Sequence, residues 1–249
     1  MYPFDLTGKN ILITGASSGI GRAVAIECSK LGAQLIVTGR DNERLQETLN
    51  SLAGNNHQAI LCNLIESDKL EELVRSIQTI DGLVLSAGIN DKTLTKSISA
   101  EKIDKMFSIN LYSPMFLIKE LLKKKKLNVN ASVVAISSVS SSYSTISNAL
   151  YAASKGALES FMRVLALEVA PRRIRVNAIK PAAVETPIIA SYKLADEMEL
   201  FKKQIPLGRF GKPEEIAYGA IYLLSDAAAW ITGTILTIDG GLTLSLIHI

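Results

Sequence analysis

The chain contains little of what metal centres and disulfide scaffolds require. Its 249 residues include only two cysteines and two histidines. Cys28 and Cys62 are far apart and form no closely spaced pair, which excludes a disulfide scaffold and gives no sign of a cysteine-based metal or redox motif. His57 and His248 alone do not make a histidine-rich metal site. We therefore expect no bound metal.

Net charge and long apolar runs are equally scarce. The 27 basic and 24 acidic residues leave a formal charge of +3, which is too small to indicate a nucleic-acid-binding protein. No run reaches the ~18 apolar residues of a membrane span, and the longest candidate, residues 219–238, is interrupted by Asp226. Residues 1–10 lack the apolar stretch of a signal peptide. We expect a soluble, cytoplasmic protein of a reducing compartment, with neither nucleic acid nor a membrane as its partner.

Short apolar runs alternate with longer amphipathic segments along the chain. Hydrophobic residues make up 48% of the sequence, enough for a sizeable core. The short runs are rich in β-branched residues and mostly apolar on both faces, as is typical of buried parallel strands; they are residues 10–14, 34–38, 58–62, 83–86, 132–136, 175–179 and 234–238. Helical spacing is found in residues 19–31, 42–52, 67–76, 100–126, 149–169 and 213–224. This alternation, with no linker or repeat, predicts one domain: an α/β, Rossmann-type doubly wound fold with a seven-stranded parallel sheet and helices on both faces.

Residues 186–206 interrupt this alternation between the sixth predicted strand and the last predicted helix. The segment is bounded by prolines and contains a short helical pattern around residues 195–203. A long insertion beyond the carboxyl end of a strand is typical of a lid over a ligand site. We therefore interpret residues 186–206 as a candidate lid.

A glycine-rich turn follows the first predicted strand. The strand leads into Thr14-Gly15-Ala16-Ser17-Ser18-Gly19-Ile20-Gly21, and a helical segment comes next. Glycines at these spacings allow a tight turn, let the backbone approach a pyrophosphate, and let helix and strand pack closely. The N-terminus of the helix would offer free N–H groups and a positive dipole end to that anion. A plain tight turn is the alternative, but the strand before it and the helix after it favour a dinucleotide site.

A second motif carries proton chemistry. Tyr151 and Lys155 are four residues apart in a helical segment, so they share one face, and Ser138 precedes them. A tyrosine, whose pKa is near ~10, is a poor proton donor or acceptor at neutral pH unless a nearby ammonium stabilises its phenolate. A bare Tyr-xxx-Lys pattern occurs by chance in many helices. Because the same chain also contains the glycine-rich turn, chance is a poor explanation for this Tyr-xxx-Lys pattern.

The glycine-rich turn, the Ser–Tyr–xxx–Lys set and the chain length together resemble the short-chain dehydrogenase/reductase superfamily. The resemblance covers nearly the whole chain. It extends to Asn110 in Ser108-Ile109-Asn110-Leu111, to Asn177 with Pro181, and to Ile231-Thr232-Gly233 and Asp239-Gly240-Gly241. Within the superfamily the chain is most similar to the bacterial 3-oxoacyl-[acyl-carrier-protein] reductases. These motifs are specific for the family and far less specific for the substrate.

The resemblance implies four catalytic residues. Tyr151 would protonate the carbonyl oxygen as hydride arrives from the nicotinamide, and would act as the base in the reverse direction. Lys155 would lower the pKa of Tyr151 and bind the nicotinamide ribose. Ser138, selected within a serine-rich segment by the family's spacing, would hydrogen-bond the substrate oxygen. Asn110 would hold a water near Lys155.

The resemblance also implies a set of cofactor-binding positions. Some of them depart from the family's pattern: Asn63 stands where an aspartate is common, Leu85-Ser86 where two asparagines are usual, and Ala182 where a glycine is usual. The asparagine oxygen of residue 63 can still accept a hydrogen bond from the adenine amino group. The implied positions are Gly15, Ser17, Ser18, Gly19, Ile20, Gly21, Arg40, Asn63, Leu64, Ala87, Gly88, Tyr151, Lys155, Pro181, Ala182, Val184 and Thr186.

The end of the second predicted strand indicates which nucleotide is preferred. NAD-binding folds usually place an acidic residue there, whereas this chain has Thr38-Gly39-Arg40. A 2′-phosphate could bind the Arg40 guanidinium, with help from the Ser17 hydroxyl. Asp41 comes too late in the sequence to fill the acidic position comfortably. A solvated arginine opening the next helix is the alternative, and we favour NADP(H) over NAD(H).

The substrate and the partners are less determined by the sequence. A 3-oxoacyl thioester is the leading substrate, a secondary alcohol, sugar or polyol is the alternative, and a non-catalytic dinucleotide sensor is the alternative from another class. Lys123–Lys126 and Arg172-Arg173 could form a basic patch near the site entrance that docks an acidic acyl carrier protein, or they could be solvated helix ends.

Two further expectations follow from the resemblance. It implies that the apolar faces of residues 100–122 and 149–169 pair in a homotetramer or homodimer, although they could also be ordinary core. The family's domain ends near residue 243, so we interpret 1–243 as the domain. Residues 244–249 are then either a non-native tail or a natural apolar tail, and we assign no function to His248.

Overall fold

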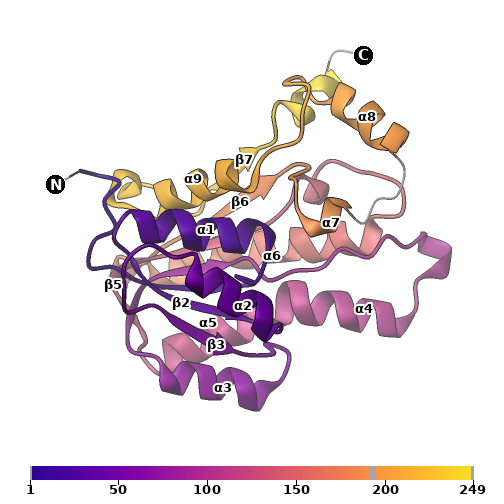
Figure 1. Cartoon of the computed structure of the whole chain (residues 1–249). Coiled ribbons are helices and arrows are strands. Elements are labelled where there is room, and N and C mark those ends of the chain that lie inside the picture. Colours follow the sequence, from indigo (N-terminus) through magenta and orange to yellow (C-terminus); the bar gives the residue numbers. More distant parts are fainter. Residues whose placement is uncertain (1, 191–194, 248–249) are drawn as a thin grey trace.

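A computed structural model describes residues 2–190 and 195–247, so part of the candidate lid (191–194) and His248 lie outside the described residues (Figure 1). Within the described residues, seven strands form one parallel sheet in the order β3-β2-β1-β4-β5-β6-β7. The strands are β1 (Asn10–Thr14), β2 (Gln34–Gly39), β3 (Gln58–Leu61), β4 (Ile80–Leu85), β5 (Leu127–Ile136), β6 (Arg175–Pro181) and β7 (Ile235–Ile238). The expected Rossmann-type fold is confirmed.

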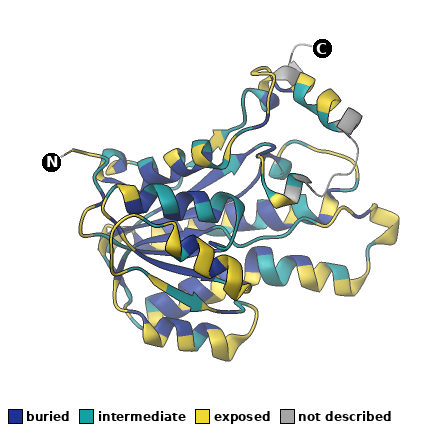
Figure 2. Cartoon of the chain, in the orientation of Figure 1, coloured by how far each residue is buried: buried dark blue, intermediate teal, exposed yellow. Residues whose placement is uncertain are grey.

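Helices cover both faces of this sheet because its strands are apolar on both sides. In β1, Ile11 and Ile13 pack into the core layer shared with α1 (Gly19–Lys30) and α9 (Pro213–Leu224). Leu12 points the other way, into the layer with α3 (Ser67–Ser76), α5 (Ser113–Lys123) and α6 (Ala149–Val169). Buried residues therefore follow the strands and alternate with exposed ones along the helices on both faces of the sheet (Figure 2). This is the alternation expected of a strand that is buried on both faces.

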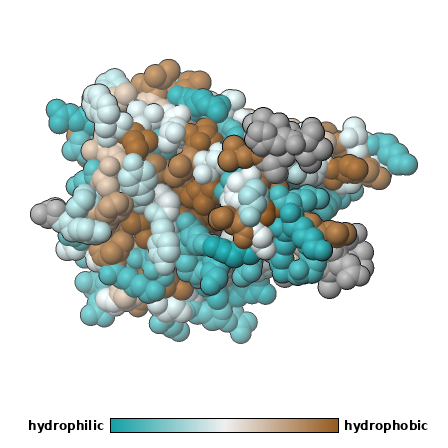
Figure 3. Space-filling view, turned by 90° about the horizontal axis from the view of Figure 1, so that it is seen from above, coloured by the Kyte–Doolittle hydropathy of each residue, from teal (hydrophilic) through white to brown (hydrophobic). Residues whose placement is uncertain are grey.

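Two helices and a small third core lie beyond the carboxyl edge of the sheet. These helices are α7 (Pro187–Ala190) and α8 (Ala195–Gln204), in the segment interpreted as a lid. Ile205 and Phe210 are buried there against Val139 and Leu242, with Phe201 packed beside them. The segment thus folds over the carboxyl ends of the strands. The face seen from above, where α1 and α9 lie in Figure 1, has apolar side chains near its middle, between hydrophilic ones (Figure 3).

The helix predicted over residues 100–126 is interrupted, so that prediction was wrong in detail. The structure has α4 (Ala100–Phe107), a π-helical turn at Ser108–Tyr112 and then α5. Lys125 adopts a left-handed φ of 53° beyond the end of α5, and β5 begins at Leu127 rather than at residue 132. Residues 127–131 alternate apolar and polar side chains, which is itself typical of a half-buried strand, so the earlier start of β5 had a signal that the prediction did not use. The π-helical turn holds Asn110 in a fully buried position. The remaining helix on the sheet is α2 (Asn42–Asn50).

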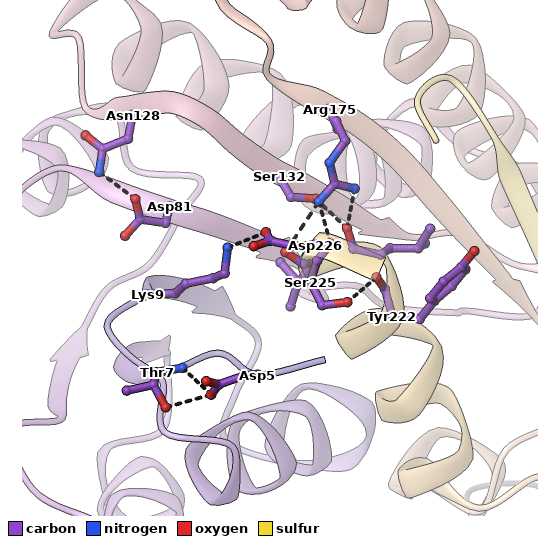
Figure 4. Close-up of polar contacts among 12 residues, drawn as sticks. Asp5, Thr7, Lys9, Asp81, Asn128, Ser132, Arg175, Tyr222, Ser225 and Asp226 are labelled. Atoms are coloured by element: carbon purple, nitrogen blue, oxygen red, sulfur yellow. Dashed lines mark hydrogen bonds and ion pairs between the residues drawn. The ribbon is translucent and has the colours of Figure 1, made fainter. Parts of the chain in front are cut away.

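The amino edge of the sheet is closed by polar contacts between distant segments (Figure 4). Arg175, at the start of β6, donates to the carbonyl oxygens of Leu223 at 2.6 Å and Ser225 at 3.0 Å. The Ser132 hydroxyl donates to the same Leu223 carbonyl at 2.8 Å. Asp226 Oδ1 accepts a hydrogen bond from Lys9 Nζ at 2.8 Å. The bonds to Leu223 and Ser225 satisfy carbonyl groups that would otherwise be unpaired at the end of α9.

The basic residues expected near the site entrance lie at this amino edge. Lys123–Lys126 end immediately before β5 begins at Leu127, and Arg172-Arg173 come shortly before β6. Lys126 donates to the Ile77 carbonyl and Arg172 to that of Leu127. In a parallel sheet the end of each helix leads to the amino end of the next strand. Within this chain the expected position beside the entrance was therefore wrong.

Neither metal ligation nor a membrane span has a structural basis in the described residues. No three histidine, cysteine, aspartate or glutamate side chains in residues 2–190 and 195–247 come together as a metal site. None of the helices that the structure describes combines the length and the apolar character needed to cross a membrane. Cys28 and Cys62 are free and buried, and burial raises the pKa of both thiols.

Candidate active site

A large cavity of about 680 Å³ opens at the carboxyl edge of the sheet. Its walls come from the segments that follow β1, β2, β3, β4, β5 and β6, together with α6 and the candidate lid. This is where an open parallel α/β sheet binds its ligands, and the volume is within the usual range for a small-molecule or cofactor site.

The glycine-rich turn forms one end of the cavity. Gly15 has a φ of 65°, and a Cβ there would lie 2.7 Å from the backbone of Ala87. A Cβ on Gly21 would lie 2.4 Å from the Gly15 carbonyl oxygen. The turn can therefore close only with glycine at these two positions. Ser18, the residue before α1, makes no side-chain capping bond, so the first N–H groups of α1 remain available to an anion.

Arg40 and its neighbours line the cavity beside this turn. The Arg40 side chain is exposed, and no other described residue forms a hydrogen bond or ion pair with it. The Asp41 carboxylate is engaged elsewhere, since it caps α2 by accepting the Arg44 N–H at 3.1 Å and lies 3.4 Å from Arg44 Nε. Asp41 thus does not replace the missing acidic residue. Arg44 also lines the cavity.

Asn63 provides a direct test of whether a nucleotide fits. Its Nδ2 donates to Glu66 Oε1 at 2.6 Å, which fixes the orientation of the amide. Its Oδ1 is buried and finds no hydrogen-bond donor among the described residues. A buried acceptor without a partner is costly. An adenine amino group could supply the missing donor, so the residues present fit a dinucleotide.

The candidate catalytic side chains meet at the other end of the cavity. Helix α6 places Tyr151 and Lys155 on one face, with Lys155 Nζ 5.8 Å from the centre of the Tyr151 ring. Ser138, at the end of β5, lines the same cavity, and its hydroxyl accepts a hydrogen bond from the Ser140 N–H at 3.2 Å. Lys155 is almost fully buried and donates to the Ile136 carbonyl at 2.8 Å. Burial lowers the pKa of Lys155 to about 8, and the nearby Glu159 opposes that shift.

Two of the residues expected in the site lie behind its walls. Gly21 is buried under the glycine-rich turn, where it acts through packing. Asn110 accepts the Ile89 N–H at 2.9 Å and donates to the Ile89 carbonyl at 3.0 Å and to Ser154 Oγ at 3.0 Å. Asn110 therefore ties the segment after β4 to α6, next to the candidate catalytic pair. The other expected site residues line the cavity: Gly15, Ser17, Ser18, Gly19, Ile20, Arg40, Asn63, Leu64, Ala87, Gly88, Ser138, Tyr151, Lys155, Pro181, Ala182, Val184 and Thr186.

Sequence reasoning missed several lining residues. Arg44 is a second arginine only four residues after Arg40, in the first turn of α2, and this proximity in the sequence was a usable signal. Tyr143 and Asn148, from the segment between β5 and α6, and Phe201, from α8 in the candidate lid, also line the cavity. Both segments were expected to shape the substrate site. No local pattern marks which of their side chains reach the cavity, because that depends on how the segments fold over the sheet.

Comparison with known proteins agrees with this geometry. A family model described as enoyl-(acyl carrier protein) reductase matches residues 15–243. The 3-oxoacyl-[acyl-carrier-protein] reductase FabG of Rickettsia conorii is 36% identical over 239 residues, covering 96% of this chain and 98% of that protein. The structure of a short-chain dehydrogenase/reductase, glucose/ribitol dehydrogenase, from Brucella melitensis is 34% identical with a TM-score of 0.90, covering 96% of this chain and 98% of the other. An actinorhodin polyketide ketoreductase variant with NADPH is 29% identical with a TM-score of 0.88, covering 94% and 97%.

The fold and the cavity thus define an NAD(P)-dependent oxidoreductase with a doubly wound sheet. The chain belongs to the short-chain dehydrogenase/reductase family, with relatives among the bacterial FabG reductases.

Proposed function

We propose that this enzyme uses NADPH to reduce a carbonyl group to a secondary alcohol, with a 3-oxoacyl thioester as its substrate. The observation that carries the proposal is that Ser138, Tyr151 and Lys155 line the same cavity as the glycine-rich turn. Reduction of a ketone needs a hydride and a proton delivered to adjacent atoms, and this cavity combines a nucleotide site with a proton donor. The similarity to 3-oxoacyl-[acyl-carrier-protein] reductases supports the choice of substrate.

Each catalytic side chain has a distinct task in this reaction. The bound nicotinamide nucleotide supplies the hydride to the carbonyl carbon. Tyr151 gives its phenolic proton to the carbonyl oxygen, and the Lys155 ammonium stabilises the phenolate that remains. The Ser138 hydroxyl donates to the same oxygen and stabilises its developing charge. Asn110 supports the site from behind through Ile89 and Ser154.

Arg40 supports NADPH as the preferred nucleotide. We expect Arg40→Ala to lower kcat/KM for NADPH about 10- to 100-fold, because a charge-assisted bond to the 2′-phosphate is lost. The value for NADH should change little, and steady-state rates with each nucleotide measure both. Arg75→Ala, an exposed arginine on α3, is the matched control. Equal use of NADH by the unmodified enzyme, or indifference to Arg40→Ala, would overturn the preference.

The substrate is tested by comparing thioesters in one assay. We expect NADPH oxidation at ~340 nm with an acetoacetyl thioester and none with the corresponding enoyl thioester, because Tyr151 is placed to protonate an oxygen. The enoyl compound is included because of the description of the matching family model. Turnover confined to a sugar, polyol or other secondary alcohol would replace the thioester with that substrate class. Turnover that is much faster on carrier protein than on pantetheine would support acyl carrier protein as a partner.

We also propose that the enzyme assembles as a homotetramer or homodimer. Phe116 on α5 and Leu167 on α6 are 54% and 77% exposed, although both helices also face the core. Large apolar side chains exposed on neighbouring helices are typical of an interface between subunits.

A further inference from the structure

A buried carboxylate lies directly behind the catalytic pair. Glu159 is on α6, one helical turn beyond Lys155, and only 5% of it is exposed. It does not line the cavity, so it does not reach substrate or nucleotide. A buried carboxylate is destabilising unless it is paired and hydrogen-bonded. The contacts that satisfy it therefore indicate what it holds in place.

One carboxylate oxygen of Glu159 holds the turn that carries Ser138. Glu159 Oε1 accepts a hydrogen bond from Ser137 Oγ at 2.7 Å and another from Ser141 Oγ at 2.7 Å. These two serines lie on either side of Ser138 in the sequence. The Ser141 N–H also donates to the Ser138 carbonyl at 3.1 Å, which closes the turn. Ser138 thus lies between two serines, Ser137 and Ser141, that are both hydrogen-bonded to the Glu159 carboxylate.

The other carboxylate oxygen faces cations. Glu159 Oε2 lies 3.5 Å from Lys180 Nζ on β6 and 3.8 Å from Arg163 Nη2 on α6. The Lys180 side chain is 12% exposed and that of Arg163 is 52% exposed, so Lys180 is the less screened partner. The charged groups that face Glu159 are therefore Lys155 and Arg163 from its own helix and Lys180 from the sheet.

We propose that Glu159 is a positioning residue of the active site, whose carboxylate fixes the turn bearing Ser138 and places a counter-charge one helical turn from Lys155. This inference rests on the proposed function, since it concerns residues that act in that reaction. Lys180 is the partner that balances the carboxylate. The Glu159 carboxylate and the Lys180 ammonium on β6 therefore both influence the pKa of Lys155.

Substitution of Glu159 and substitution of Lys180 should shift the pKa of Lys155 in opposite directions. Reduction requires Lys155 and Tyr151 to be protonated together, so its rate falls when the pair loses its first proton. Glu159 raises the pKa of Lys155, in opposition to burial. Glu159→Gln removes the negative charge. The first proton of the pair is then lost at a lower pH, and the alkaline limb of the kcat/KM profile shifts to lower pH. Lys180→Met removes a positive charge beside Glu159 and shifts the same limb to higher pH. We expect shifts of about one pH unit, the effect of a charge at this range.

The pH profile of NADPH-dependent reduction tests the proposal in Glu159→Gln, Lys180→Met and the matched control Glu168→Gln. Glu168 lies on the same helix and is exposed, so the control variant should retain the profile of the unmodified enzyme. A merely structural ion pair predicts that both test variants lose stability and rate without opposite shifts of the limb. Glu159→Leu, which also removes the acceptor for the two serines, should lower kcat about tenfold more than Glu159→Gln.

A second measurement does not depend on turnover. The titration of Lys155 is followed by nuclear magnetic resonance with ¹⁵N-labelled lysine and assigned with Lys155→Met. Its midpoint should fall in Glu159→Gln, rise in Lys180→Met and stay unchanged in Glu168→Gln. An unmoved midpoint overturns the proposal. Moved midpoints in a protein that reduces no carbonyl support the charge coupling and refute the proposed function instead.

Discussion

Tyr151→Phe should lower kcat/KM for carbonyl reduction about 10²- to 10⁴-fold, the usual contribution of a positioned general acid. Phenylalanine keeps the ring against Lys155, whose Nζ lies 5.8 Å from the ring centre, but it has no proton to give. Nucleotide binding should persist within about twofold, because the glycine-rich turn and Arg40 are unchanged. Steady-state rates give the first quantity, and nucleotide fluorescence titration gives the second.

Tyr218→Phe is the matched control for that substitution. Tyr218 is on α9 and is 56% exposed, so removal of its hydroxyl should leave kcat/KM unchanged. If Tyr151→Phe retains more than a tenth of the activity, Tyr151 is not the proton donor. The sensor alternative makes the opposite prediction, because a protein that only binds a dinucleotide should keep its output without the tyrosine hydroxyl.

Gly21→Ala should abolish tight nucleotide binding and lower the free energy of unfolding by about 1–3 kcal/mol, the usual cost of overpacking. The new Cβ would lie 2.4 Å from the Gly15 carbonyl oxygen, and this atom is backbone and cannot rotate away. The turn must therefore open, and the N–H groups that would hold the pyrophosphate lose their arrangement. Fluorescence titration with NADPH and denaturant unfolding measure the two effects.

Gly156→Ala separates this clash from a general effect of alanine. A Cβ on Gly156 meets nothing within 4 Å, and the residue lies inside α6. Alanine in a helix interior is favoured over glycine by about 1 kcal/mol, so this variant should unfold at higher denaturant concentration. Unimpaired NADPH binding by Gly21→Ala would show that the turn does not hold the nucleotide.

The seven strands and the position of the glycine-rich turn could be predicted because both depend on local patterns. Ile11, Leu12 and Ile13 show in the sequence that β1 is buried on both faces, and a parallel sheet then places the following turn at its carboxyl edge. The spacing of Tyr151 and Lys155 likewise needs only one helix. These predictions required no knowledge of distant contacts.

The features that the sequence did not predict depend on contacts between distant segments. The π-helical turn that buries Asn110 has no recognised local signature in the sequence, so residues 100–126 resembled one continuous element. The run Lys123–Lys126 has an evident charge, but only the sheet determines which edge it occupies. Glu159, on α6, is four residues after Lys155, yet its partner Lys180 comes from strand β6. The sequence shows the charge and the spacing of these residues, but it does not show where they lie in three dimensions.

The central claim is that hydride goes to a carbonyl carbon while Tyr151 supplies the proton. The most direct test is to reduce an acetoacetyl thioester with NADPH that carries deuterium at the transferable nicotinamide position, and to locate the label by nuclear magnetic resonance. The account predicts one deuterium on the new carbinol carbon, and none of this product when Tyr151→Phe is used. Deuterium at any other carbon of the product, or a labelled alcohol formed equally well by Tyr151→Phe, would contradict it.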